Sequence, residues 1–181
     1  FQRLSPSPLK HPYLISTNDA LAKTIGLHVH RWTPSDWIDA FAGDTLLEGC
    51  DPIAMKYSGH QFGQYNPDLG DGRGVLLGEL MSPDGQRLDL HLKGAGPTAY
   101  SRFADGRAVL RSSIREYLAS EALVGLGIPT TRALALFGSE QVTIRSGAER
   151  CALLLRCSPC HIRFDHFEHV YYLGQYSDLI H

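Results

Sequence analysis

The stretch from Tyr57 to Glu121 decides the fold, and its centre reads GDGRG at positions 70–74. Two strand-like runs follow this glycine-dense turn. The second run ends on Lys93, and a helical segment carrying Glu116 comes next. Glycines let backbone N–H groups come close to an anion, so this turn can form a phosphate-binding nest. A strand lysine held by a helical carboxylate is how kinase-like folds grip nucleotide phosphates. The order of these parts therefore predicts a nucleotide-binding site.

The two strand-like runs predict an antiparallel hairpin. Residues 75–81 and 87–93 flank the turn SPDG at 82–85, in which proline presets φ and glycine accepts a positive φ. Leucines alternate with polar residues along 87–93, so the leucines face one way and Lys93 faces the other. We expect one buried face, with the lysine on the polar face where a ligand can reach it.

The remainder of the chain predicts an α+β fold in which an antiparallel sheet lies beside one long helix. The helix is predicted from about residue 107 to residue 126, because apolar residues recur there at helical spacing. These apolar residues are Leu110, Ile114, Tyr117, Leu118 and Ala122. Three more strands are predicted at 131–137, 141–146 and 150–157.

The first part of the chain is expected to be less regular. Residues 1–16 are rich in proline and read as an extended arm, and residues 57–74 read as an ordered loop. We divide the chain into an N-terminal extension with short helices, residues 1–56, and a nucleotide-binding unit, residues 57–181.

Composition narrows the classes of function. The 181 residues carry a net charge of -2, and 43% of them are hydrophobic, which is ordinary for a globular protein. The absence of a basic excess argues against nucleic acid as a partner. No apolar run approaches the roughly 18 residues of a membrane span, so no membrane partner is expected. Four cysteines are too few for a disulfide scaffold and favour a reducing, cytoplasmic location.

Cys157 and Cys160 form a CxxC motif with histidines nearby, so a zinc site is one alternative. A redox role would need a thioredoxin-like context, which the sequence lacks. We therefore favour small, partly buried thiols without a function of their own. Packing or surface positions are also expected for His60, His91, His161, His166 and His169.

Three charged residues have two alternative interpretations. Lys93 could bind phosphate, or it could be an exposed lysine that protects a strand edge from pairing. Glu116 and Glu121 both lie on the predicted helix, and either could be the partner of the lysine. Glu121 lies nearer the apolar stripe, and the pattern alone does not choose between the two.

The remaining candidates are also ambiguous when judged by pattern alone. Asp105 and Gly106 precede the long helix, so we favour an N-terminal cap over a nucleotide contact. Arg156 and Arg163 flank the CxxC motif. Arginine suits bidentate binding of phosphate, but the pattern favours two surface arginines close to acidic residues.

Taken together, the motifs of this chain resemble those of the selenoprotein O (SelO, YdiU) family. The matching segments are YSGHQFG at 57–63, LGDGRG at 69–74, HLKGAGPT at 91–98, SR at 101–102, LRSSIREY at 110–117, GIPTTRA at 127–133 and HIRF at 161–164. Runs of this length are far more specific than a bare glycine motif, and together they cover nearly the whole chain.

The resemblance implies a fold similar to the N-lobe of protein kinases, with ATP bound in a reversed orientation. It implies the transfer of AMP, rather than phosphate, to Ser, Thr or Tyr hydroxyls of proteins. Lys93 matches the phosphate-binding lysine of the family, and Glu116 matches its helical partner. The other nucleotide contacts that the resemblance implies are Gly70, Gly72, Arg73, Asp105, Gly106, Arg156 and Arg163.

The resemblance also implies parts that lie further along. The catalytic aspartate of the family and its ligands for Mg or Mn are expected beyond His181, so we assign no catalytic or metal-binding residue within 1–181. We expect this chain to be the nucleotide-binding part of an adenylyltransferase and to be inactive alone. Two alternatives stay open: a conventional phosphotransferase on the same scaffold, and a regulatory module that binds nucleotide without turnover.

Overall fold

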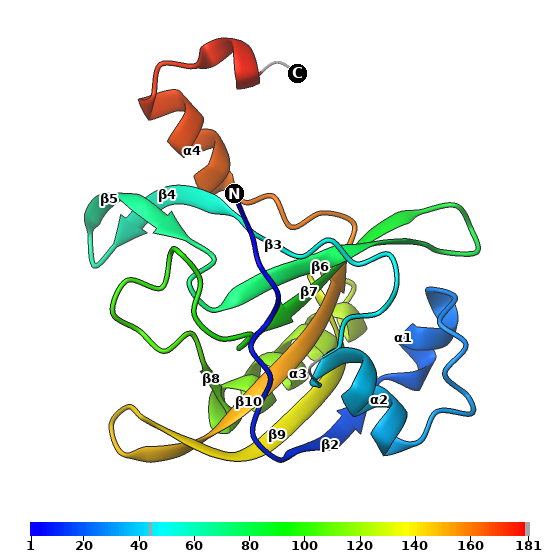
Figure 1. Cartoon of the computed structure of the whole chain (residues 1–181). Helices are drawn as coiled ribbons and strands as arrows, with labels where there is room; N and C mark the ends of the chain where they lie inside the picture. The colour runs from blue at the N-terminus through cyan, green and yellow to red at the C-terminus, as the bar shows by residue number, and fades with distance from the viewer. Residues whose placement is uncertain (44, 180–181) are drawn as a thin grey trace.

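The chain forms one large antiparallel sheet and a separate two-stranded hairpin (Figure 1). The structure is a computed structural model that describes residues 1–43 and 45–179. The large sheet follows the order β1-β3-β6-β7-β10-β9-β2, and β8 pairs with β10. Its strands are β1 (Gln2–Arg3), β2 (Pro12–Thr17), β3 (Ile53–Ala54), β6 (Gly74–Met81), β7 (Arg87–Lys93), β8 (Ala108–Val109), β9 (Arg132–Ile144) and β10 (Ala148–Ser158). The predicted α+β class with an antiparallel sheet is therefore confirmed.

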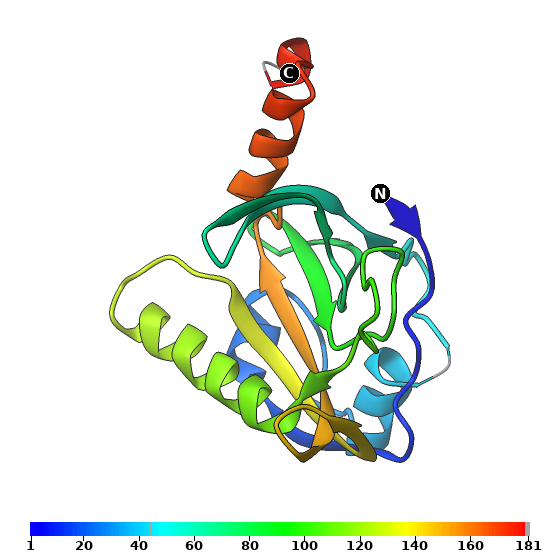
Figure 2. The ribbon, with the colours of Figure 1, turned by 90° about the vertical axis from the view of Figure 1, so that its left-hand side faces the viewer.

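Helices cover both faces of this sheet (Figure 2). The covering helices are α1 (Asp19–Thr24), α2 (Pro34–Phe41) and α3 (Leu110–Gly125). The helix α4 (Phe164–Tyr172), followed by a 3-10 turn, Tyr176–Leu179, instead contacts β4 and projects away from the large sheet (Figure 2). The central strand β10 carries the apolar run CALLL at 151–155, which is buried throughout. Leu153 and Leu155 pack in the core shared with α1 and α2, whereas Ala152 and Leu154 pack with residues of α3. A continuous apolar run thus produces a strand covered on both faces.

The short helices expected in the first part of the chain are α1 and α2, and both begin at a polar cap. Asn18 caps α1 by accepting the N–H of Leu21 at 3.0 Å. Thr33 caps α2, and the backbone N–H of Thr33 donates to Asp36 at 2.6 Å, which completes a capping box. The strand β2 then pairs with β9, so this first part of the chain is built into the main sheet.

The register of the central strands brings the candidate site residues to one end of the sheet. Lys93 lies opposite Gly74 on β6, and His91 lies opposite Arg156 on β10. Above this end stands the separate hairpin of β4 (Lys56–Gln61) and β5 (Gln64–Gly70), and α4 contacts β4 (Figures 1 and 2). The chain therefore reaches the glycine turn at 70–74 directly from the hairpin.

Two predictions about strands are wrong. Residues 57–74, expected as a loop, form most of the β4–β5 hairpin. Residues 131–137 and 141–146, expected as two strands, lie largely in the single strand β9. Gly138 and Ser139 read as a turn, but they instead pair with β2, a partner far away in the sequence.

The prediction of one buried face for residues 87–93 is also wrong, and the apolar residues of α3 are buried only in part. The strand 87–93 was expected to have one buried face, but Asp89 and His91 on its polar face are buried as well. Along α3, the predicted apolar residues Ile114 and Leu118 are 39% and 63% exposed. Of the predicted apolar residues, Leu110 and Tyr117 pack against the sheet, and the small residue Ser113 on the same helix is 2% exposed.

None of the helices within residues 1–43 and 45–179 is long and apolar enough to cross a membrane.

Candidate functional site

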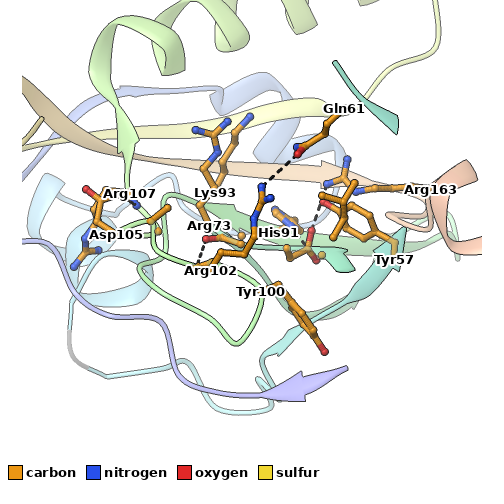
Figure 3. Close-up of a pocket in the computed structure, with 18 of the residues that line it drawn as sticks. Tyr57, Gln61, Arg73, His91, Lys93, Tyr100, Arg102, Asp105, Arg107 and Arg163 are labelled. Carbon is orange, nitrogen blue, oxygen red and sulfur yellow. Dashed lines mark hydrogen bonds and ion pairs between the residues drawn. The ribbon is translucent and has the colours of Figure 1, made fainter. Parts of the chain in front are cut away.

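A pocket of about 450 Å³ opens beside the glycine turn. In Figure 3, Asp105 and Arg107 lie at one end of it, Tyr57 and Arg163 lie at the other, and Lys93 lies between them. All eight residues predicted to contact nucleotide line this pocket: Gly70, Gly72, Arg73, Lys93, Asp105, Gly106, Arg156 and Arg163. The fold thus gathers residues that are up to 93 positions apart in the sequence around one cavity.

The pocket is strongly cationic. Its basic side chains are Arg73, Lys93, Arg102, Arg107, Arg145, Arg156 and Arg163. The carboxylates that line it are Asp71 and Asp105, and both are already bonded within the protein. A concave site lined mainly by one sign of charge attracts ligands of the opposite sign, and arginine matches the geometry of phosphate oxygens. The arrangement therefore fits a polyanionic ligand such as a nucleotide triphosphate.

The ion pair expected between Lys93 and Glu116 is present. Lys93 Nζ donates to one carboxylate oxygen of Glu116, and Arg156 Nη1 donates to the other at 3.1 Å. The side chains of Lys93 and Glu116 are 24% and 30% exposed, so the pair is partly shielded from water. Partial burial lowers the pKa of Lys93, and the neighbouring Glu116 opposes this effect. Glu116 therefore holds two cations at the edge of the pocket.

Glu121, the alternative candidate for the partner of Lys93, has a structural role. It accepts the guanidinium of Arg132 at 2.9 and 2.7 Å, the N–H of Ala133 at 3.0 Å and the amide of Asn18 at 2.8 Å. These bonds tie α3 to β9 and to the cap of α1. Glu116, and not Glu121, is therefore the partner of the lysine.

The glycine turn is held in place from one side by residues 98–101. Thr98 Oγ1 donates to the carbonyl of Asp71 at 2.8 Å, and Ser101 Oγ donates to the carbonyl of Gly72 at 2.6 Å. Two consecutive carbonyls of the turn are thereby satisfied. A turn fixed in this way presents its backbone to the pocket without having to become ordered when a ligand binds.

At one end of the pocket, Arg163 is fixed by a carboxylate and an aromatic ring. Arg163 Nη2 lies 3.5 Å from Asp71 Oδ1, and the guanidinium carbon lies 5.2 Å from the centroid of the Tyr57 ring, a cation–π geometry. Asp71 is 4% exposed and also accepts the N–H of Met55 at 3.1 Å. Burial raises the pKa of Asp71, whereas the N–H of Met55 and the charge of Arg163 lower it.

The sequence pattern favours surface positions for Arg156 and Arg163, and the structure places them differently. The side chain of Arg156 is 14% exposed and is bonded to Glu116, while that of Arg163 is 38% exposed. Both line the same pocket as the glycine turn. The interpretation of Arg156 as a surface residue is therefore wrong, because its guanidinium is bonded to Glu116 of α3 and to His91 of β7.

The interpretation of Asp105 as a helix cap is also wrong. The strand β8 intervenes, and the N-cap of α3 is Val109, which has no side-chain cap. Asp105 instead accepts Arg145 Nη2 at 2.7 Å and the hydroxyl of Thr143. Partial burial opposes ionisation of Asp105, but the hydrogen bonds from Arg145 and Thr143 prevail and lower its pKa to about 2. An ionised Asp105 thus fixes Arg145 at the rim of the pocket.

Gly106 lies next to Asp105 and cannot readily be another residue. Its φ is +66°, in the left-handed region, and a Cβ there would lie 2.0 Å from the carbonyl oxygen of Gly96. The backbone therefore crosses itself closely at this corner of the pocket.

Sequence reasoning missed several residues that line the pocket: Tyr57, His91, Tyr100, Arg102, Arg107 and Arg145. A signal existed for His91, because strict alternation places it on the same face of β7 as Lys93, two residues away. No such signal existed for Arg107, whose guanidinium donates to the carbonyls of Ser7 and Pro8 at 2.8 Å each. That contact spans about a hundred residues of sequence.

The carboxylates at the pocket do not fit a bound metal ion. Glu116 is shared by Lys93 and Arg156, Asp71 is bonded to Met55 and faces Arg163, and Asp105 is bonded to Arg145. Throughout residues 1–43 and 45–179, no three His, Cys, Asp or Glu side chains are grouped as metal ligands. These three carboxylates are therefore committed to other groups and are not available as metal ligands.

The cysteines of the CxxC motif have different environments. Cys157 is 2% exposed in the core and Cys160 is exposed, and both are free thiols. Burial raises the pKa of Cys157 to about 11, so this thiol is neutral at ordinary pH.

Comparison with known proteins gives a consistent match. A family model described as "Protein adenylyltransferase SelO" matches residues 1–181. A protein nucleotidyltransferase YdiU of Hahella chejuensis is 59% identical over 179 residues, which are 99% of this chain and 36% of the relative. Proteins of the same name are 53% identical in Aliivibrio fischeri, over 99% of this chain and 37% of the relative, and 51% identical in Stutzerimonas stutzeri, over 98% and 36%. The chain thus spans about a third of the length of the curated relatives it matches.

Proposed function

The chain belongs to the SelO family of protein adenylyltransferases, and from that premise we propose that it is the ATP-binding part of such an enzyme. The parent protein transfers AMP from ATP to Ser, Thr or Tyr hydroxyls of other proteins. The observation that carries the proposal is the cationic pocket, in which Lys93, Arg156 and Arg163 converge beside the glycine turn. A cytoplasmic location is part of the proposal, because the cysteines are free thiols.

The arrangement of the cations supports a kinase-like lobe that holds ATP in reversed orientation. Lys93 on β7 and Glu116 on α3 correspond to the strand lysine and helical glutamate of kinase-like folds. Arg156 and Arg163 add two guanidinium groups in the same pocket. In our proposal they hold the terminal phosphates, so that the α-phosphate, rather than the γ-phosphate, is exposed to the attacking hydroxyl.

Positioning and electrostatic stabilisation account for the contribution of this part of the enzyme. Charge spreads over the phosphate oxygens during transfer, and cations fixed in advance stabilise it without reorganising. Glu116 fixes Lys93 and Arg156, and Asp71 fixes Arg163. Mg or Mn would neutralise further charge on the phosphates, and we propose that its ligands and the catalytic aspartate lie beyond residue 181.

Product analysis tests this function. The full-length protein is incubated with a mixture of proteins and with ATP labelled either at the α-phosphate or at the γ-phosphate. We expect protein to be labelled from the α-position alone, with release of pyrophosphate. Label from the γ-position with formation of ADP would instead identify a phosphotransferase, and ATP binding without labelled protein would identify a regulatory module.

A matched pair of variants assigns the activity to this pocket. Lys93→Met removes the cation that Glu116 holds, and we expect loss of AMP transfer with the fold retained. Lys23→Met, in the exposed last turn of α1 and outside the pocket, should retain wild-type transfer. Equal activity of the two variants would refute the assignment.

Residues 1–181 alone should not transfer AMP, because the carboxylates near the pocket are committed to other groups. The test is incubation of this chain with labelled ATP and with magnesium or manganese. Protein labelling that disappears in Lys93→Met would contradict the expectation.

A further inference from the structure

His91 lies directly behind the two arginines of the pocket. It is 1% exposed on β7, and its Nδ1 lies 2.9 Å from Arg156 Nη2. Its ring stacks on that of His161, with centroids 4.9 Å apart and an interplanar angle of 14°. The proposed function gives this histidine no role.

The contact with Arg156 determines the protonation state of His91. A guanidinium can only donate hydrogen bonds, so Nδ1 of His91 must accept. The ring is then neutral, and its proton is on Nε2. Burial lowers the pKa of His91 well below its ordinary value, and the neighbouring charge of Arg156 adds to this effect. Burial also lowers the pKa of His161, to about 4, with Arg156 and Arg163 contributing. Two neutral rings therefore lie behind two charged arginines.

The other nitrogen of His91 faces the carboxylate that holds Arg163. Nε2 lies 4.0 Å from Asp71 Oδ2, and the other oxygen of Asp71 lies 3.5 Å from Arg163 Nη2. His91 Nε2 has no hydrogen-bond partner within residues 1–43 and 45–179. The 4.0 Å between Nε2 and Asp71 Oδ2 is too long for a hydrogen bond. His91 therefore lies between Arg156 and the carboxylate of Asp71.

Packing alone does not explain a histidine at this position. A buried ring that only fills space would be apolar, because burying an unsatisfied polar nitrogen costs free energy. The protein also accommodates His91 at its neighbour Gly74, where a Cβ would lie 2.5 Å from His91 Cε1. Glycine at that position leaves room for the imidazole beneath the glycine turn.

We propose that His91 is a positioning residue that sets the phosphate-binding arginine Arg156 through its Nδ1. The proposal rests on the proposed function, because it assigns Arg156 to the terminal phosphates. It adds that the orientation of Arg156 is fixed before ATP arrives. The affinity for ATP should then depend on an acceptor at the position of Nδ1, rather than on the aromatic ring.

Two variants separate the acceptor from the ring. His91→Phe keeps a ring that can stack on His161 but removes the acceptor for Arg156. His91→Asn removes the ring but places an amide oxygen close to the position of Nδ1. The measurement is the affinity of the full-length protein for ATP and, as a reference, for AMP, which lacks the terminal phosphates.

We expect His91→Phe to weaken ATP binding about tenfold, as loss of one hydrogen bond to a charged group would, and to leave AMP binding unchanged. His91→Asn should stay within about threefold of wild type for both nucleotides. Wild-type ATP affinity in His91→Phe would overturn the proposal. An equal loss in the two variants would also overturn it, because the ring rather than the acceptor would then be responsible.

A second measurement requires neither a nucleotide nor a variant protein. Nitrogen-15 NMR of the wild-type protein without ATP reports which ring nitrogen of His91 carries the proton. We expect Nε2 to be protonated and Nδ1 to be free, and a proton on Nδ1 would overturn the proposal. If the wild type failed to bind ATP, the proposed function would fail while this readout still tested the arrangement of His91.

Discussion

Replacing Gly74 by alanine should destabilise the protein by displacing His91. The new Cβ would lie 2.5 Å from His91 Cε1 and 2.9 Å from Nε2, which is closer than real Cβ atoms come to other atoms. The φ of Gly74 is outside the left-handed region, and alanine suits a strand better than glycine does. We therefore expect the steric clash to account for the loss of stability in Gly74→Ala.

The size of this loss of stability depends on how far the ring of His91 can move. Ordinary contact begins at 3.4 Å, so the ring must move by about 0.9 Å from its 2.5 Å contact. His91 is 1% exposed, stacks on His161 and is bonded to Arg156, which leaves it little room to retreat. Overpacking of this kind costs about 1–3 kcal/mol. For a chain of this size, a loss of about 2 kcal/mol lowers Tm by about 4–8 °C.

Thermal unfolding followed by calorimetry measures this loss. Gly125→Ala is the matched control, because a Cβ at the last residue of α3 would meet nothing within 4 Å. That control should be stabilised by about 0.5–1 kcal/mol, since alanine restricts the unfolded chain. In a His91→Ala background the clash disappears, so Gly74→Ala should cost far less there.

Two results would refute this reasoning. One is a Gly74→Ala protein that unfolds at or above the temperature of the wild type. The other is an equal loss of stability with and without the His91 ring, because the cost would then arise from something other than the clash.

Further predictions concern groups around the pocket. Glu121→Gln should lower the free energy of unfolding, measured by urea denaturation, by about 1–3 kcal/mol, because it weakens the hydrogen bonds that the carboxylate accepts. The affinity for ATP should stay unchanged, since Glu121 does not line the pocket, and a large loss of affinity would contradict this. The pKa of Asp105 is lowered to about 2, so its pair with Arg145 contributes stability above about pH 4 that is lost as pH falls through 2. Asp105→Asn should lack this acid-dependent loss in unfolding measured across that range, and an unchanged pH profile would count against the pair. Iodoacetamide at about pH 8 should alkylate the exposed Cys160 and spare the buried Cys157, whose pKa is about 11. Mass spectrometry measures the two rates, and similar rates would contradict the buried position of Cys157.

The parts of the fold that the sequence predicted are those with local causes. The hairpin of β6 and β7 follows from a proline-glycine turn and from alternation, both of which lie within about twenty residues. The strand β9 was split wrongly because Gly138 looked like a turn residue. In the structure this glycine instead makes room for the ring of Tyr13 on β2, since a Cβ would lie 2.5 Å from it. Because Tyr13 and Gly138 are far apart in the sequence, the residues around Gly138 do not indicate this contact.

The same distinction applies to the candidate site. The predicted nucleotide residues came from motifs, and the structure brings all of them to one pocket. The buried layer behind them was not predicted, because His91, Asp71 and His161 acquire their partners only when β7, the glycine turn and the segment after β10 meet. Alternation placed His91 on the right face but could not show that this face would be covered.

A structure of the full-length protein with a non-hydrolysable ATP analogue tests the central claim most directly. The account predicts that the triphosphate lies in this pocket, with its terminal phosphates on Arg156 and Arg163 and with Lys93 beside the chain of phosphates. A nucleotide bound elsewhere, or one whose terminal phosphates point away from both arginines, would contradict it.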